Sequence, residues 1–204
     1  MNCLKIIDIE DDSFLDDSKF RFNTLIGIKL KYKEEVPFWV FNYHMPCSWK
    51  KPIVMIVHTI LLKNYIDKIA MNFNCVLMGD FNSKPKTIQY NILTNSDKID
   101  LLNEDYNIED YNKLETYNIS LKKNSSFKSV YKEFYKQEPD CTNYAFCGNN
   151  GSFRGTLDYI FVRSPSGYFK VNKVDNLDKN YYLSSYMPNL WPSDHLPITC
   201  EIEF

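Results

Sequence analysis

Asp80 and Asn82 follow directly on an apolar run in the segment NCVLMGDFN. A carboxylate two residues from an amide at the end of a strand lets both groups point to the same side and act on one reacting group. Asp80 could then accept a proton from an attacking water while Asn82 holds the water or a phosphate. The alternative is an Asx turn that closes the strand, which turn propensity alone favours for an isolated Asp-x-Asn.

A second polar group lies near the C-terminus, where Ser193, Asp194 and His195 precede the apolar segment LPI. Asp194 offers an oxygen ligand for a metal ion, and His195 offers a cation for a phosphate. A capped turn with a surface histidine is the more ordinary explanation of this triplet, so the functional interpretation depends on other residues.

Asp158 is such a residue, because it lies in GTLDYIFV among large apolar side chains. A buried carboxylate needs a partner, and His195 is a suitable one. The pair would raise the proton affinity of the imidazole, fix its tautomer and aim it at a phosphoryl oxygen. The simpler alternative is that Asp158 bonds only to a loop backbone.

Two further histidines occupy different contexts. His44 ends the strand-like segment PFWVFNY before a turn that contains proline, whereas His58 lies in a helical pattern and is expected to be structural. Every candidate in the functional group ends or borders an apolar strand and enters a loop. The sequence therefore predicts that His44, Asp80, Asn82, Asp194 and His195 cluster at one end of a sheet.

The segments that carry these residues alternate between strand-like and helical patterns, which predicts a mixed α/β (α+β) fold. Residues 96–126, rich in Asn, Asp and Lys, are expected to form a polar surface insertion within one domain spanning 1–204. Residues 23–43 alternate apolar and polar side chains around a Lys-Glu-Glu turn, which indicates a hairpin. The other expected elements are helices over 53–71, 84–95 and 129–136, and extended segments over 75–78, 142–146, 157–162 and 197–204.

Composition limits the classes of function. With 204 residues and 44% hydrophobic content the chain can bury a substantial core. A net charge of −2 argues against a broad electrostatic grip on nucleic acid, so a phosphodiester substrate must be held locally. The six cysteines form no CxxC pair and are expected to be reduced and mostly buried. Without an apolar run of about 18 residues or a signal-like N-terminus, we expect an intracellular, most simply cytoplasmic, protein with no membrane partner.

Five segments occur in the order and rough spacing of one protein family: NYHMPC, GDFNSKP, EPDCTNY, FRGTLDYIF and LWPSDHLPI. From about Leu25 to its last residue the chain resembles the deadenylase-like branch of the endonuclease/exonuclease/phosphatase superfamily, which includes nocturnin, the angel proteins and the 2′,5′-phosphodiesterases. The resemblance implies part of a four-layer α/β/β/α sandwich. It also implies a phosphodiesterase or nuclease that uses Mg²⁺ or Mn²⁺ and acts on RNA 3′ ends or oligoadenylate.

Position by position, the resemblance implies that Asp194 contributes to the metal site and that Asn143 contacts substrate. Phe153 matches an aromatic position that stacks on a nucleobase, although a core or rim aromatic is an equal alternative. The residues to which the resemblance assigns catalytic roles are His44, Asp80, Asn82, Asp158 and His195.

The sequence departs from the family pattern before His44, where a metal-binding glutamate in a Gln-Glu context is normally found. Glu10 is the candidate by position, but it lacks that context. We therefore expect the C-terminal half of the fold, with a separate N-terminal half as a partner besides the RNA substrate. Two alternatives remain open: an impaired remnant that binds nucleotide or a protein, and a phosphatase of the same superfamily.

Overall fold

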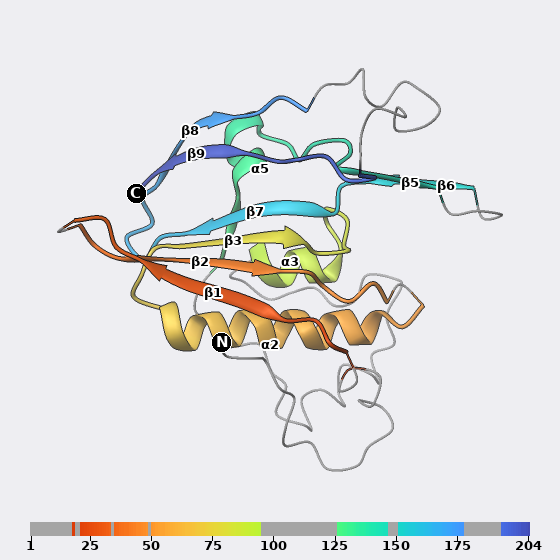
Figure 1. Ribbon diagram of the computed structural model, residues 1–204, viewed down its shortest axis with the longest axis horizontal. Coiled ribbons are helices and arrows are strands. Elements are labelled where there is room, and N and C mark those ends of the chain that lie inside the picture. Colours follow the sequence, from red (N-terminus) through yellow and green to blue (C-terminus); the bar gives the residue numbers. More distant parts are fainter. Residues whose placement is uncertain are drawn as a thin grey trace, which may run out of the picture.

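The computed structural model describes the chain over residues 18, 21–33, 35–48, 50–94, 126–146, 151–177 and 193–204. Glu10 and nearly all of the expected insertion at 96–126 lie outside these residues. Within them, strands and helices alternate in the mixed α/β arrangement that the sequence predicts (Figure 1).

A five-stranded sheet forms the centre of the molecule, in the order β1-β2-β3-β7-β4. Strands β1 and β2 form the expected antiparallel hairpin, and β2 runs parallel to β3. Strand β7 lies antiparallel to β3 and also pairs with the short β4. The bounds are Leu25–Leu30 for β1, Phe38–Tyr43 for β2, Cys75–Asp80 for β3, Lys128–Ser129 for β4 and Asp158–Arg163 for β7.

Helices α2 (Pro52–Ala70) and α3 (Ile88–Thr94) contribute to the larger of the cores. Phe41, Leu77 and Phe161 are direct neighbours across β2, β3 and β7, and all three are fully buried in this core. Helix α2 matches its predicted range closely because Pro52 is well suited to a first helical turn. Helix α3 begins later than the sequence suggests.

The late start of α3 has a local cause. Lys86 adopts a left-handed backbone conformation with φ 70°, which a helix cannot include. Thr87 then acts as the helix cap, because its Oγ1 accepts the backbone N–H of Tyr90 at 3.5 Å.

The other side of the sheet is only partly covered. Helix α5 (Val130–Tyr135) and a hairpin of β8 (Lys170–Val174) and β9 (Cys200–Glu203) pack over β7. Strand β8 lies in a connection that the sequence did not predict to be a strand, because its Lys- and Asn-rich segment has few apolar residues. Strand β6 (Ser152–Gly155), which pairs with the expected β5 (Asn143–Phe146), was also not predicted.

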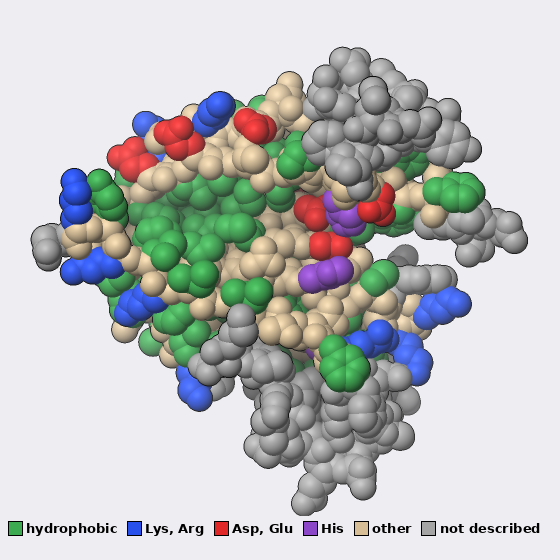
Figure 2. Space-filling view, viewed as in Figure 1, with side chains coloured by type: hydrophobic (Ala, Val, Ile, Leu, Met, Phe, Trp, Pro, Cys, Tyr) green, Lys and Arg blue, Asp and Glu red, His purple; other side chains and the backbone are tan. Residues whose placement is uncertain are grey.

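An apolar surface is exposed at the β1 edge on this second side of the sheet. Ile26, Ile28 and Leu30 alternate along β1 and are 45%, 53% and 43% exposed. Figure 2 shows a broad hydrophobic area on the side of the molecule that faces the viewer. Apolar patches of this kind mark surfaces that contact other protein segments.

The buried histidine on α2 has a structural role, as predicted. The Tyr43 hydroxyl donates to Nδ1 of His58 at 2.7 Å, and Nε2 of His58 donates to the Ser18 carbonyl at 3.2 Å. Burial lowers the pKa of His58, so the ring is neutral and serves as a polar link in the core.

The described cysteines are all free thiols, as expected, but only Cys75 and Cys141 are buried. Cys47 is exposed because it lies in the loop after β2, and Cys200 is partly exposed on the two-stranded β8–β9 hairpin. The expectation of mostly buried thiols is therefore wrong for half of the described cysteines. None of the helices in the described part of the chain is long and apolar enough to cross a membrane.

Candidate active site

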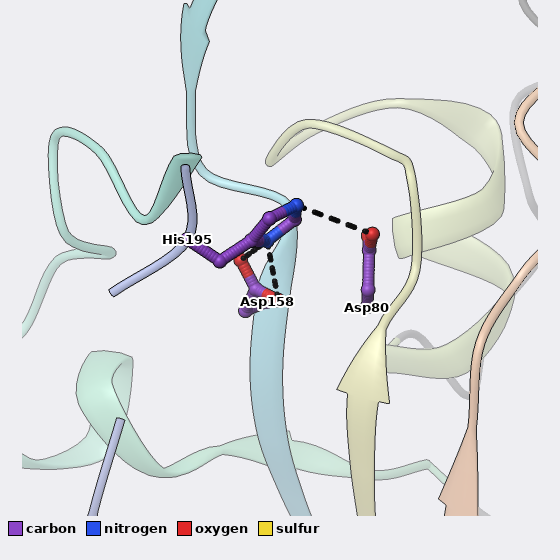
Figure 3. A group of neighbouring side chains, drawn as sticks. All are labelled: Asp80, Asp158 and His195. Carbon is purple, nitrogen blue, oxygen red and sulfur yellow. Dashed lines mark hydrogen bonds and ion pairs between the residues drawn. The ribbon is translucent and has the colours of Figure 1, made fainter. Parts of the chain in front are cut away.

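Sheet register brings two carboxylates together. Asp80 is the last residue of β3 and Asp158 the first residue of β7, and the two are direct partners across the antiparallel pair. His44 follows β2, which runs parallel to β3 and therefore ends at the same edge of the sheet. His195 reaches this edge from the loop before β9 (Figure 3). Of the residues predicted to cluster, His44, Asp80 and His195 are brought together at this edge.

The predicted pair of Asp158 and His195 is also confirmed. Nδ1 of His195 lies 2.9 Å from Oδ2 and 3.0 Å from Oδ1 of Asp158. Because an ionised carboxylate only accepts hydrogen bonds, Nδ1 carries a proton and donates it. The opposite ring nitrogen, Nε2, then faces Asp80, whose Oδ2 lies 3.8 Å away (Figure 3).

Asp80 lies between two imidazoles. Nε2 of His44 is 3.5 Å from the same Oδ2 that faces His195, and the His44 side chain is 69% exposed. Burial is the main reason why the pKa of Asp80 is raised. The charge of Asp158 adds to this effect, while the N–H of Asn82 and both histidines oppose it. For His195, burial lowers the pKa, but the hydrogen bond and charge of Asp158, helped by Asp80 and Asp194, outweigh it, so that its pKa is raised.

Asn82 adopts the Asx turn that was the alternative explanation of this motif. Its backbone N–H donates to Oδ1 of Asp80 at 2.8 Å, and its φ of 48° lies in the left-handed region. Strand β3 ends at Asp80, so strand alternation does not orient Asn82 as the sequence suggested. Instead Nδ2 of Asn82 donates to the Met45 carbonyl at 2.8 Å, and the N–H of Met45 donates to the Asp80 carbonyl. The Asx turn and the functional site are therefore not exclusive alternatives, because the turn holds the Asp80 side chain at the site.

Asn143 holds the loop that carries the Ser-Asp-His triplet. Its Nδ2 donates to the backbone oxygen of Asp194 at 3.2 Å and to Oδ2 at 3.4 Å. Asn143 is only 3% exposed, whereas Asp194 is exposed. In this arrangement the Asn143 amide is bonded to Asp194 and faces away from solvent.

Three residues near the site were not singled out from the sequence. Thr142 is fully buried, and its Oγ1 accepts the N–H groups of Leu157 and Asp158 at 2.9 and 3.0 Å. Gly79 has φ 135°, and a Cβ there would lie 2.1 Å from the Tyr43 carbonyl oxygen. The third is Lys84, whose Nζ lies 5.0 Å from the ring centroid of the partly exposed Phe153. Only Gly79 had a local signal, because glycine suits backbones that approach closely.

Within the described residues, Asp80, Asp158 and His195 each offer one ligand atom, and these atoms all lie within 4.8 Å of one another. Mg²⁺ and Mn²⁺ prefer oxygen ligands, which carboxylates supply. Asp158 is bonded to His195, and Asp80 faces both His44 and His195. The donor set fits such an ion in part and leaves most coordination positions to water, substrate or other protein groups.

Comparisons with known proteins identify the family of the chain. The model of the Endonuclease/Exonuclease/phosphatase family matches residues 7–195. The 2′,5′-phosphodiesterase 12 proteins of Bos taurus and Homo sapiens are each 28% identical over 135 residues, which is 63% of this chain and 19% of each relative. The chain therefore spans about a fifth of the length of these relatives.

Solved structures share the fold. ANGEL2, a 2′,3′-cyclic phosphatase solved in complex with adenosine-2′,3′-vanadate, superposes with a TM-score of 0.70 at 20% identity, over 95% of this chain and 64% of its own. The catalytic domain of human nocturnin superposes with a TM-score of 0.53 at 20% identity, over 89% of this chain and 53% of its own. The structural likeness establishes the fold, and the match over most of the sequence establishes that the chain belongs to the Endonuclease/Exonuclease/phosphatase family.

Proposed function

We propose that this chain carries the phosphate-binding and proton-transfer residues of a divalent-metal-dependent phosphodiesterase, which acts on RNA 3′ ends or oligoadenylate. The observation that carries the proposal is the arrangement around His195, with Asp158 on one ring nitrogen and Asp80 facing the other. The family match and the likeness to 2′,5′-phosphodiesterase 12 support a phosphodiester substrate.

In this proposal each side chain has a distinct task. Asp158 holds the His195 ring and favours its protonated form, so Nε2–H can donate to a phosphoryl oxygen as negative charge develops there. His44 can supply a second donor from the opposite side of Asp80. Asp80 orients an attacking water in line with the leaving oxygen and accepts its proton.

The neighbouring loops position these groups. Asn82 fixes Asp80 through the Asx turn, and Asn143 positions Asp194, which we propose as an oxygen donor to the metal. We propose that Phe153 stacks on a base of the substrate. A bound Mg²⁺ or Mn²⁺ would stabilise negative charge on the phosphoryl oxygens and lower the pKa of its water.

The exposed side of β1 supports a related proposal about partners. We propose that a further part of the family fold, in the same polypeptide or in a separate chain, covers Ile26, Ile28 and Leu30 in the active enzyme. That part would also contribute the metal ligands that Asp194 does not supply.

The test is a single-turnover cleavage assay with 3′,5′-linked RNA, 2′,5′-linked oligoadenylate and a 2′,3′-cyclic phosphate end, with and without Mg²⁺. The 204-residue chain is compared with the same chain fused to a family-like N-terminal half. We expect faster cleavage by the fusion, and at least a hundredfold loss of that cleavage on Asp80→Ala or His195→Gln, as for removal of other catalytic acid–base groups.

Asp140→Asn is the matched control, because Asp140 is an exposed carboxylate on the loop before β5. Equal cleavage by Asp80→Ala and the unaltered fusion would remove the proposed mechanism. Absence of cleavage of all three substrates by both unaltered proteins would remove the proposed activity.

A further inference from the structure

Lys84 extends over the β5–β6 hairpin beside the site. It follows Asn82 by two residues, is exposed, and its Nζ lies 5.0 Å from the Phe153 ring centroid. The backbone of Lys84 is fixed, because its carbonyl accepts the N–H and the Oγ1–H of Thr87 at 3.3 and 2.8 Å. Within the described part of the chain, no carboxylate forms an ion pair with the Lys84 ammonium.

Gly155 shows that Lys84 and Phe153 share one face of the hairpin. A Cβ at Gly155 would lie 3.1 Å from Cε of Lys84 and 3.1 Å from Cζ of Phe153. Gly155 pairs with Asn143, and Phe153 pairs with Ala145, so these positions alternate onto the same face. Asn143 in turn holds Asp194. The β5–β6 hairpin therefore contacts both the candidate metal ligand Asp194, through Asn143, and the Lys84 side chain.

An ammonium over a partly exposed ring is held weakly, and a nucleobase stacks on an aromatic ring more strongly. A base that docks on Phe153 would therefore displace the ammonium without a large cost. The Lys84 ammonium would then lie beside a nucleotide, close to the anionic phosphates that flank the docked base. Lysine serves well as a point charge for a phosphate that need not be held in one exact geometry.

We propose that Lys84 and Phe153 together bind the nucleotide next to the scissile phosphate, with the base on the ring and the flanking phosphate on the ammonium. This inference rests on the proposed function and deepens it: the substrate is a chain with at least one phosphate besides the one that is cleaved. Lys84 is thus a specificity-determining residue that favours oligonucleotides over substrates with a single phosphoester.

The test measures binding without divalent metal, so that cleavage does not interfere. Fluorescein-labelled oligoadenylate is compared with the same oligomer carrying a neutral methylphosphonate at the flanking linkage. We expect Lys84→Gln to weaken binding of the anionic oligomer about tenfold, the loss of one charge-assisted contact. The methylphosphonate oligomer should bind equally to both proteins, and Lys84→Arg should retain most of the affinity.

Lys86→Gln is the matched control, because Lys86 is an exposed lysine of the same loop that makes no ring contact among the described residues. The salt dependence of binding should also become shallower by about 0.7 in log–log slope for Lys84→Gln, as for one lost phosphate contact on a single strand. An equal loss of affinity for both oligomers, an equal effect of Lys86→Gln, or no oligomer binding by the unaltered chain would overturn the subsite.

The subsite and the proposed activity can fail separately. Binding of the anionic oligomer that depends on Lys84, without cleavage once Mg²⁺ and the N-terminal half are present, would support the subsite and overturn the activity. Cleavage that depends on Asp80, with binding that does not change on Lys84→Gln, would support the activity and overturn the subsite.

Discussion

Nδ1 of His195 lies within 3.0 Å of both carboxylate oxygens of Asp158. This contact joins the first residue of β7 to a loop 37 residues later in the chain. It fixes the tautomer of the imidazole and, with nearby acidic residues, raises its pKa against the opposing effect of burial. The protonation state of His195 is therefore a sensitive measure of whether the site is assembled.

Asp158→Asn should lower the pKa of His195, because it removes the negative charge nearest to the ring. In metal-free buffer, the titration of the His195 ring protons by NMR should shift to lower pH than in the unaltered chain. An unchanged His195 titration would mean that Asp158 does not control its charge.

The same raised pKa predicts a pH dependence of stability. A histidine whose folded pKa exceeds its unfolded value of about 6.5 stabilises the fold fully below that value, and this contribution is lost as pH rises through the folded pKa. The free energy of unfolding lost on Asp158→Asn should therefore be larger at acidic than at alkaline pH. Urea titrations of both proteins across this range measure the difference, and a loss that grows with pH would contradict it.

Thr142→Val should destabilise the fold and loosen Asp158. The substitution keeps the shape but leaves the N–H groups of Leu157 and Asp158 without their acceptor. Unsatisfied buried groups cost about 1–3 kcal/mol each. Thr142→Ser retains the hydroxyl and should lose less stability in the same urea titration. If both variants lose the same amount, the methyl group and not the hydrogen bonds explains the effect.

Gly79→Ala should disturb the position of Asp80. Both Gly79 and Gly167 have positive φ, 135° and 75°, so an alanine is strained at either position. Only at Gly79 would the new Cβ also collide with the Tyr43 carbonyl, at 2.1 Å, whereas Gly167 has nothing within 4 Å. Gly79→Ala should therefore lose about 1–3 kcal/mol more than Gly167→Ala, the cost of overpacking. If thermal unfolding shows that the two variants lose the same stability, the backbone at Tyr43 can shift to accept the new Cβ without cost.

Asp67→Ala should be strongly destabilising. The Asp67 side chain is 8% exposed and pairs with both Lys63 and Arg163, which are themselves buried. Removing the carboxylate leaves two buried cations without it, and breaking a buried pair in this way costs about 3–5 kcal/mol. Glu201→Gln, at an exposed position on β9, is the control and should be near neutral. A small effect of Asp67→Ala in chemical denaturation would indicate that water reaches this cluster.

Much of the fold could be predicted because apolar periodicity is a local property of the chain. Some elements contain enough apolar residues for their spacing to show a helix or strand repeat. They are the hairpin over 23–43, the helix that begins at Pro52 and the strands that carry Asp80 and Asp158. The Asp158–His195 pair was predictable for a related reason, since a carboxylate inside an apolar strand requires a donor. Strand β8 and the start of α3 were missed, because one depends on pairing with β9 and the other on the left-handed Lys86.

The residue types and their order in the chain thus determined the family, the main elements and the candidate site residues. Only the tertiary structure decided how these groups meet. The register of β3 against β7 sets Asp80 opposite Asp158, and the Asx turn directs Asn82 toward Met45. The fold also brings Lys84 over a ring 69 positions later in the sequence. Such contacts join segments distant in the chain, and their geometry follows from strand pairing and backbone torsions that no local pattern specifies.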